Sequence, residues 1–170
     1  VQQSDFDLAD EGTPGVEQVL AGLQAGDKRL LARLFTLLEN GEAPALKEPI
    51  LKAAAGLTVP VLGITGTGGA GKSSLTDEIV RRFRLDQGDT VKIGLISIDP
   101  SRKRTGGALL GDRIRMNAIA PWSGGPRVFM RSLATREAGS EISAALPDVL
   151  AACKAAGFDL VIVETSGIGQ

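Results

Sequence analysis

Residues 66–73 read Gly-Thr-Gly-Gly-Ala-Gly-Lys-Ser and match the pattern G-x-x-x-x-G-K-[ST] at every fixed position. An apolar run, residues 59–64, comes directly before this octapeptide, and apolar residues at helical spacing follow it. In a strand–loop–helix context, the loop amides and the positive end of the helix converge on one anion. The pattern therefore predicts a phosphate-binding loop and restricts residues 57–170 to an α/β fold.

Strand-like and helix-like segments alternate along the rest of the chain. The expected strands are residues 91–98, 128–130 and 158–163, and the expected helices are residues 112–119 and 140–156. This alternation predicts a parallel sheet with right-handed crossovers, flanked by helices. The run before the glycine-rich loop contains no charged residue, which is typical of a strand buried on both faces.

The segment before this α/β part is predicted to be helical. Asp27 suits the start of a helix, and Gly41 suits its end. We expect a loop bounded by Pro44 and Pro49, followed by a short helix over residues 50–55, because proline interrupts helices.

Three regions are expected from these patterns. Residues 1–13 are polar and acidic and are interpreted as a linker or tail, residues 14–56 as a helical lead-in, and residues 57–170 as the phosphate-loop domain. The chain begins without Met and without the basic and apolar regions of a secretion signal. We therefore expect a segment of a longer, cytoplasmic protein.

The composition excludes several kinds of site. The 170 residues include no His and one Cys, so a Ser-His-Asp triad, a His-ligated metal and a Cys-based zinc site are ruled out. Cys153 is expected to be a buried, reduced core residue. The formal net charge of -1 argues against a nucleic-acid partner, and the sequence has no apolar stretch long enough to span a membrane.

The phosphate-binding loop suggests how the chain would treat a nucleotide. Lys72 would place its ammonium on the β- and γ-phosphates, and the Ser73 hydroxyl would be a magnesium ligand. Arg115 is a candidate for neutralising charge that develops at the γ-phosphate, with a surface ion pair to Asp112 as an equally weighted alternative. Gln170 is a candidate for orienting the attacking water, because no His is available.

Acidic residues occur where a metal partner is needed. Asp99 follows the second expected strand, Glu164 ends the last one, and Asp112 opens a short helix, for which a helix cap is the structural alternative. Magnesium prefers oxygen ligands and keeps several waters, so these carboxylates suit it. Gly167 lies three residues after Glu164, a spacing at which its amide would contact a γ-phosphate.

Four segments together resemble the MeaB/ArgK-type GTPases, the G-protein chaperones of adenosylcobalamin-dependent acyl-CoA mutases. They are residues 66–74, 98–101, 106–116 and 163–170. Residues 129–142 resemble more closely the central G domain of the fused isobutyryl-CoA mutases. The chain departs from the stand-alone chaperones where they carry a second Ser after Asp-Pro-Ser, because it has Arg-Lys-Arg at residues 102–104.

The resemblance implies two sets of site residues. The nucleotide-binding set is Gly68, Gly69, Ala70, Gly71, Lys72, Ser73, Ser74, Arg115 and Gly167. The magnesium set is Ser73, Ile98, through its carbonyl, Asp99, Asp112, Glu164 and Thr165. The resemblance also implies that the nucleotide is GTP or GDP. The guanine-reading N-K-x-D segment of the family is missing from the sequence, so we expect the C-terminal part of the domain to be absent.

The resemblance implies a function as well. Magnesium-dependent GTP hydrolysis would gate cofactor loading and protect a mutase that interconverts isobutyryl-CoA and butyryl-CoA. The B12-binding and acyl-CoA-binding domains would lie in the same chain, which would form a homodimer. Adenosylcobalamin would be ligated outside this segment, because the segment has no His.

Two other functions remain open at this point. One is a stand-alone chaperone that acts on a separate methylmalonyl-CoA-type mutase, and the other is a phosphate-loop kinase of a small molecule. The basic residues 102–104 would bind an acidic partner or form a solvated loop.

Overall fold

The computed structural model describes residues 14–66, 71–88, 90–99, 128–134 and 144–165. Within these residues the strands form one parallel sheet in the order β1-β4-β2-β3. The strands are β1 (Val61–Ile64), β2 (Ile93–Asp99), β3 (Val128–Ala134) and β4 (Leu160–Thr165). Parallel strands joined by crossovers confirm the predicted α/β class.

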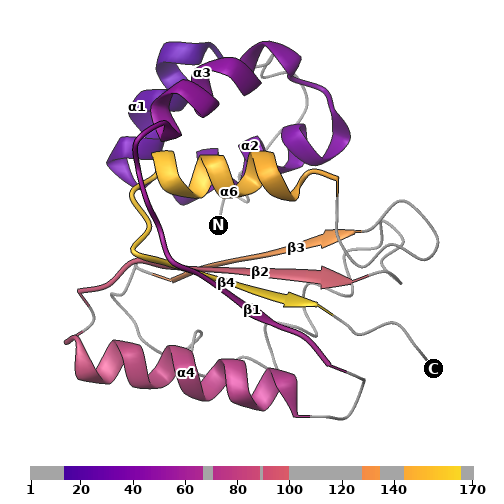
Figure 1. The fold of residues 1–170 in the computed structure, drawn as a ribbon. Helices are drawn as coiled ribbons and strands as arrows, with labels where there is room; N and C mark the ends of the chain where they lie inside the picture. The colour runs from indigo at the N-terminus through magenta and orange to yellow at the C-terminus, as the bar shows by residue number, and fades with distance from the viewer. Residues whose placement is uncertain (1–13, 67–70, 89, 100–127, 135–143, 166–170) are drawn as a thin grey trace, which may run out of the picture.

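Helices lie on both faces of this sheet (Figure 1). They are α1 (Val16–Ala25), α2 (Lys28–Asn40), α3 (Pro44–Ala54), α4 (Lys72–Asp86) and α6 (Leu146–Ala155). Figure 1 shows α4 on one side of the sheet, and α6 with the three N-terminal helices on the other. The sheet is therefore enclosed between two helical layers, as the hydrophobic strands of a parallel sheet require.

The ends of α2 follow from local sequence. The Asp27 carboxylate accepts hydrogen bonds from the backbone N–H groups of Arg29 and Leu30, at 3.0 and 3.1 Å. Gly41 ends the helix in the left-handed conformation, with φ at 69°. Both predicted ends are confirmed, because each residue satisfies backbone groups that the helix leaves unpaired.

The predicted loop between Pro44 and Pro49 is wrong. Both residues belong to α3, with Pro44 in the first turn and Pro49 in the interior. Leu46 and Ile50 are 2% and 1% exposed on this helix, and Lys47 forms an ion pair with Asp148 of α6 at 3.1 Å. Packing against neighbouring helices thus offsets the hydrogen bond that the interior proline removes.

The prediction that the first strand is buried on both faces is also wrong. Val61 and Leu62 of β1 are 46% and 38% exposed, whereas Ile64 is 8% exposed. In the part of the chain that the structure describes, β1 pairs with β4 alone and forms one edge of the sheet. An edge strand has a neighbouring strand on one side only, so its side chains can stay exposed even when they are apolar.

The N-terminal helices share a core with the sheet. Phe35 of α2 is fully buried, and its ring meets that of Phe129 on β3 edge-to-face, with centroids 5.4 Å apart. The guanidinium of Arg131 on β3 donates a hydrogen bond to the Thr36 hydroxyl at 2.6 Å and lies 3.8 Å from the Glu39 carboxylate. Aromatic packing and polar contacts together fix α2 against the outer strand of the sheet.

Lys28 adds a polar contact at the first residue of β3. Its ammonium donates to the carbonyl of Val128 at 3.1 Å. Burial lowers the pKa of Lys28, and repulsion from the nearby Arg84 guanidinium lowers it further. The first turn of α2 is thus attached to the start of β3.

Cys153 provides a direct probe of the core. It is fully buried in α6, as predicted, and burial raises the pKa of its thiol to about 12. Because the thiolate is the reactive form, we expect Cys153 to resist alkylation by iodoacetamide at pH 8 in the folded protein and to react on unfolding. Mass spectrometry of the Cys153 peptide measures this, and rapid labelling under native conditions would contradict the burial.

The described segments contain no helix with the length and apolar character needed to cross a membrane.

Candidate functional site

The described residues of the predicted nucleotide site lie at the carboxyl ends of the parallel strands. β1 and β4 are in register with Ile64 beside Glu164, and β2 and β4 are in register with Ile98 beside Thr165. The chain leaves β1 at this same edge and enters the glycine-rich loop. The crossover topology thus brings Glu164 and Thr165 next to the strand that leads into the loop.

The loop ends in a sharp backbone turn. Gly71 has φ at 84°, in the left-handed region, and caps α4. Its carbonyl accepts the first helical hydrogen bond, from the N–H of Leu75 at 2.9 Å. Glycine suits this position because other residues pay a steric cost there. The turn directs the N-terminus of α4 toward the edge of the sheet where β1 ends.

Lys72 connects the two ends of the loop. It is the first residue of α4, and its ammonium donates a hydrogen bond to the carbonyl of Gly66 at 2.7 Å. The side chain therefore extends back toward the residue at which the loop begins. In nucleotide-binding loops of this pattern, the lysine ammonium contacts the β- and γ-phosphates.

One supporting residue was missed by sequence reasoning. Thr76 is fully buried in α4, and its hydroxyl donates to the carbonyl of Lys72 at 2.9 Å. This contact anchors the first turn of the helix from below. A threonine four residues after the motif lysine is the available signal, since hydroxyl side chains often bond to the carbonyl one turn earlier.

Oxygen ligands for a cation lie at the ends of the neighbouring strands. Glu164 is 7% exposed, and the hydroxyl oxygen of Thr165 is buried with no hydrogen-bond partner among the described atoms. A buried hydroxyl without a partner costs free energy, and an oxygen-binding cation would remove that cost. These two residues therefore fit the predicted magnesium site.

The remaining predicted metal ligands are less defined. Ile98 is 1% exposed and has an apolar side chain, so its backbone carbonyl is its one oxygen, and Asp99 is the last residue of β2. Nothing is described of the Asp99 and Ser73 side chains. Among the described residues, no three His, Cys, Asp or Glu side chains lie together as a metal site.

Several predicted site residues lie outside the described part of the chain, and their roles stay predictions. They are Gly68, Gly69, Ala70, Asp112, Arg115, Gly167 and Gln170, together with the basic residues 102–104. Ser74 is described and is exposed in the first turn of α4.

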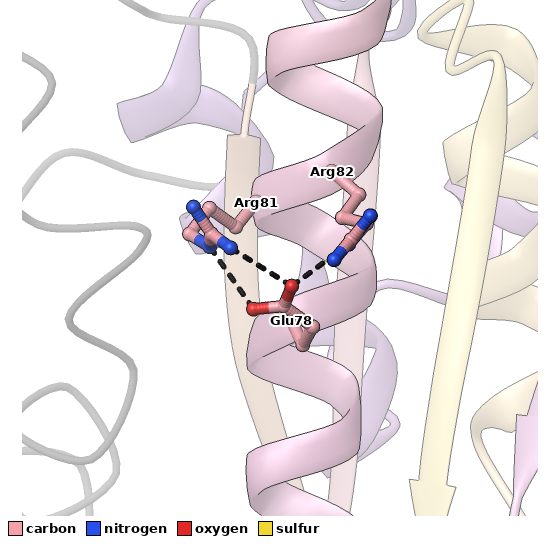
Figure 2. A network of polar contacts seen from close by, with 3 residues as sticks. All are labelled: Glu78, Arg81 and Arg82. Atoms are coloured by element: carbon pink, nitrogen blue, oxygen red, sulfur yellow. Dashed lines mark hydrogen bonds and ion pairs between the residues drawn. The ribbon is translucent and has the colours of Figure 1, made fainter.

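The outer face of α4 carries a separate polar network, drawn in Figure 2. The Glu78 carboxylate accepts two hydrogen bonds from Arg81, at 2.8 and 3.0 Å, and one from Arg82 at 2.8 Å. These hydrogen bonds lower the pKa of Glu78 to about 2. All three side chains are exposed, so the network stabilises the helix surface only modestly.

Comparison with known proteins agrees with this geometry. The family model for the Methylmalonyl Co-A mutase-associated GTPase MeaB matches residues 31–170. The fused isobutyryl-CoA mutase of Cupriavidus metallidurans is 65% identical over 170 residues, which are 99% of this chain and 15% of that protein. The GTPase ArgK of Escherichia coli is 37% identical over 153 residues, covering 87% of this chain and 44% of that protein.

A solved structure is similar as well. The crystal structure of a LAO/AO transport system kinase matches with a TM-score of 0.60 and 27% identity, over 93% of this chain and 46% of that chain. The chain thus spans less than half the length of the relatives it matches. Because the family model covers most of the chain and includes both the phosphate-binding loop and the acidic strand end, the chain belongs to the MeaB family of methylmalonyl-CoA mutase-associated GTPases.

Proposed function

We propose that this chain is the nucleotide-binding part of a magnesium-dependent GTPase that serves an adenosylcobalamin-dependent acyl-CoA mutase. The observation that supports it most is the position of Lys72, whose ammonium donates a hydrogen bond to the carbonyl of Gly66 at 2.7 Å. The end of the neighbouring strand supplies the buried oxygens of Glu164 and Thr165. A cation and an anion site side by side suit a nucleoside triphosphate with its metal.

Hydrolysis would proceed by attack of water on the γ-phosphorus. A new P–O bond forms, the bond to the β-phosphate oxygen breaks, and GDP and inorganic phosphate leave. Lys72 compensates the charge that builds up on the phosphate oxygens. Arg115 would add positive charge, Gln170 would orient the water, and the amide of Gly167 would contact the γ-phosphate.

Magnesium would be held by Ser73, Asp99, Asp112, Glu164 and Thr165, with the Ile98 carbonyl nearby. When bound, the ion supplies further compensation of phosphate charge. The remaining nucleotide contacts would come from residues 68–71 and from Ser74, which is exposed at the start of α4.

The 65% identity to a fused isobutyryl-CoA mutase supports a fused parent protein. There, residues 1–13 would be a linker, residues 14–56 a helical lead-in and residues 57–170 part of the GTPase domain. GTP hydrolysis would gate cofactor loading and protect a mutase that interconverts isobutyryl-CoA and butyryl-CoA. Adenosylcobalamin would bind outside this segment, which has no His, and the parent would be a cytoplasmic homodimer.

The test uses the complete parent protein and γ-labelled GTP or ATP, with and without magnesium. We expect GTP to bind more tightly than ATP, and labelled inorganic phosphate to be released only with magnesium. A labelled small molecule in place of inorganic phosphate would instead identify a kinase, as the name of the matching LAO/AO structure suggests for that protein. A preference for ATP would contradict the proposal.

The mass of the native polypeptide distinguishes the fused protein from a stand-alone chaperone. A chain of several times 170 residues that co-purifies with mutase activity supports fusion. A shorter chain that activates a separately added methylmalonyl-CoA-type mutase would assign the GTPase to the stand-alone class.

A further inference from the structure

Two lysines border one small cavity at the amino ends of the strands, away from the carboxyl ends that carry the nucleotide-site residues. Lys28 begins α2, and Lys92 comes directly before β2. The cavity between them has a volume of about 20 Å³. Its apolar lining comes from Leu23, Leu31, Phe129 and Phe158. A cavity of this size holds one water-sized group, so it accepts a single ligand atom when polar partners are at hand.

The two ammonium groups lie close to the same turn, the one that joins α1 to α2. A Cβ atom built on Gly26 would be 3.6 Å from the Nζ atom of Lys92. Lys28 follows two residues after Gly26, and its Nζ atom donates to the carbonyl of Val128 at 3.1 Å. Lys92 donates in the same way to the carbonyl of Ala156 at 3.2 Å. Distant parts of the chain thus bring two positive charges to one cavity.

The positive charges are not balanced by nearby carboxylates. Among the described residues, both ammonium groups have carbonyl oxygens as their polar partners, and no ion pair joins either of them to a carboxylate. Asp27 also borders the cavity, but its carboxylate accepts hydrogen bonds from the first turn of α2. The Asp159 carboxylate accepts from the backbone N–H of Lys92 at 2.8 Å. Each ammonium has three N–H donors, so each can still donate to a ligand.

This arrangement of charge is unfavourable unless an anion is bound. Lys28 and Lys92 are both half-buried, beside the rings of Phe129 and Phe158, which are each 7% exposed. Burial lowers the pKa of Lys28, and repulsion from Arg84 lowers it further. A charge at an apolar surface loses part of its hydration, and a charged hydrogen-bond acceptor compensates for that loss.

We propose that this cavity is a carboxylate-binding site, in which one carboxylate oxygen enters the cavity and the ammonium groups of Lys28 and Lys92 donate to the carboxylate. A carboxylate fits better than a phosphate, because the cavity admits one oxygen and two ammonium groups supply the donors. Two sources share this chemistry, a small free acid and an acidic side chain, and they give different labelling results. The proposal does not depend on GTP hydrolysis, so either idea can fail alone.

Amine labelling of the complete protein with an N-hydroxysuccinimide ester tests the site, with acetate as the probe. The ester reacts with the neutral amine, whereas a bound anion favours the ammonium form. Acetate in place of chloride, at constant pH and ionic strength, is expected to slow labelling of Lys28 and Lys92 by about 3-fold or more, which corresponds to a pKa rise of about half a unit. Lys52 is the control, because it is 76% exposed, and its rate is expected to stay the same. Mass spectrometry of the labelled peptides measures the rates.

Each lysine also tests the role of the other. If both bind the same carboxylate, Lys92→Gln removes the acetate effect at Lys28, and Lys28→Gln removes it at Lys92. Lys52→Gln is the matched control and is expected to leave both effects intact. Protection of Lys28 by acetate that persists in the Lys92→Gln protein would overturn the shared site.

An acidic side chain in the site gives a different pattern. Both lysines then label slowly without acetate, acetate has no effect, and a carbodiimide couples Lys28 or Lys92 to that Asp or Glu. In this coupling the lysine amine attacks the activated carboxyl carbon, an amide bond forms, and the carbodiimide leaves as a urea. Lys52 and Glu48, 3.0 Å apart, are the positive control for the cross-link. Equal labelling rates in acetate and chloride, with no cross-link at Lys28 or Lys92, would overturn the proposal.

Discussion

Replacing Lys72 with alanine in the complete protein is expected to slow GTP hydrolysis by about 10²–10³-fold, the usual cost of removing one group that stabilises transition-state charge. The ammonium donates a hydrogen bond to the carbonyl of Gly66, the first residue of the glycine-rich loop, at 2.7 Å. Its loss removes both the positive charge beside the phosphates and the link between the two ends of the loop. Single-turnover release of labelled phosphate at saturating GTP measures the chemical step.

The control for this prediction is another lysine replaced in the same way. Lys52 lies on α3, is 76% exposed and pairs only with the equally exposed Glu48 among the described residues, at 3.0 Å. Lys52→Ala is expected to leave hydrolysis unchanged. A Lys72→Ala protein that binds and hydrolyses GTP at the normal rate would disprove the assignment of the site.

The second large effect is a loss of stability, and it is expected from a substitution in the N-terminal helices. Phe35→Ala is expected to destabilise the folded domain by about 3–5 kcal/mol, the usual range for deleting a buried aromatic side chain. Phe35 is fully buried and contacts Phe129 of β3 edge-to-face. The cavity therefore opens between α2 and the sheet, and the effect reaches the nucleotide-binding part of the fold.

Phe83→Ala is the matched control, because Phe83 on α4 is 39% exposed. We expect urea denaturation to show a small change for Phe83→Ala and a large one for Phe35→Ala. If the N-terminal helices were only a linker, the two variants would have similar stabilities. That result would show that the contact between α2 and β3 contributes little.

Local sequence was sufficient to predict the features that depend on contacts between residues close together in the chain. The position of the phosphate-binding loop between a strand and a helix followed from residues 66–73 and their neighbours, and the ends of α2 followed from Asp27 and Gly41. In each case the residue type satisfies nearby backbone groups, so the feature can be predicted from a few consecutive residues.

Features that depend on distant neighbours were not predictable. The burial of β1 depends on what lies beside it in the sheet, and its composition does not specify this. Pro49 is tolerated inside α3 because Leu46 and Ile50 are buried against other helices. The packing of α2 against Phe129 and Arg131 likewise depends on the three-dimensional fold.

The place of β4 in the strand order has a mechanical consequence. It is hydrogen-bonded on both sides, to β1 and to β2, and Leu160 to Glu164 are all buried. Amides in such a strand open only with large sections of the fold, so β4 is among the stiffest parts of the molecule. Glu164 and Thr165 are thus held at the end of a rigid strand. A displacement during nucleotide turnover would therefore require less free energy outside β4 than within it.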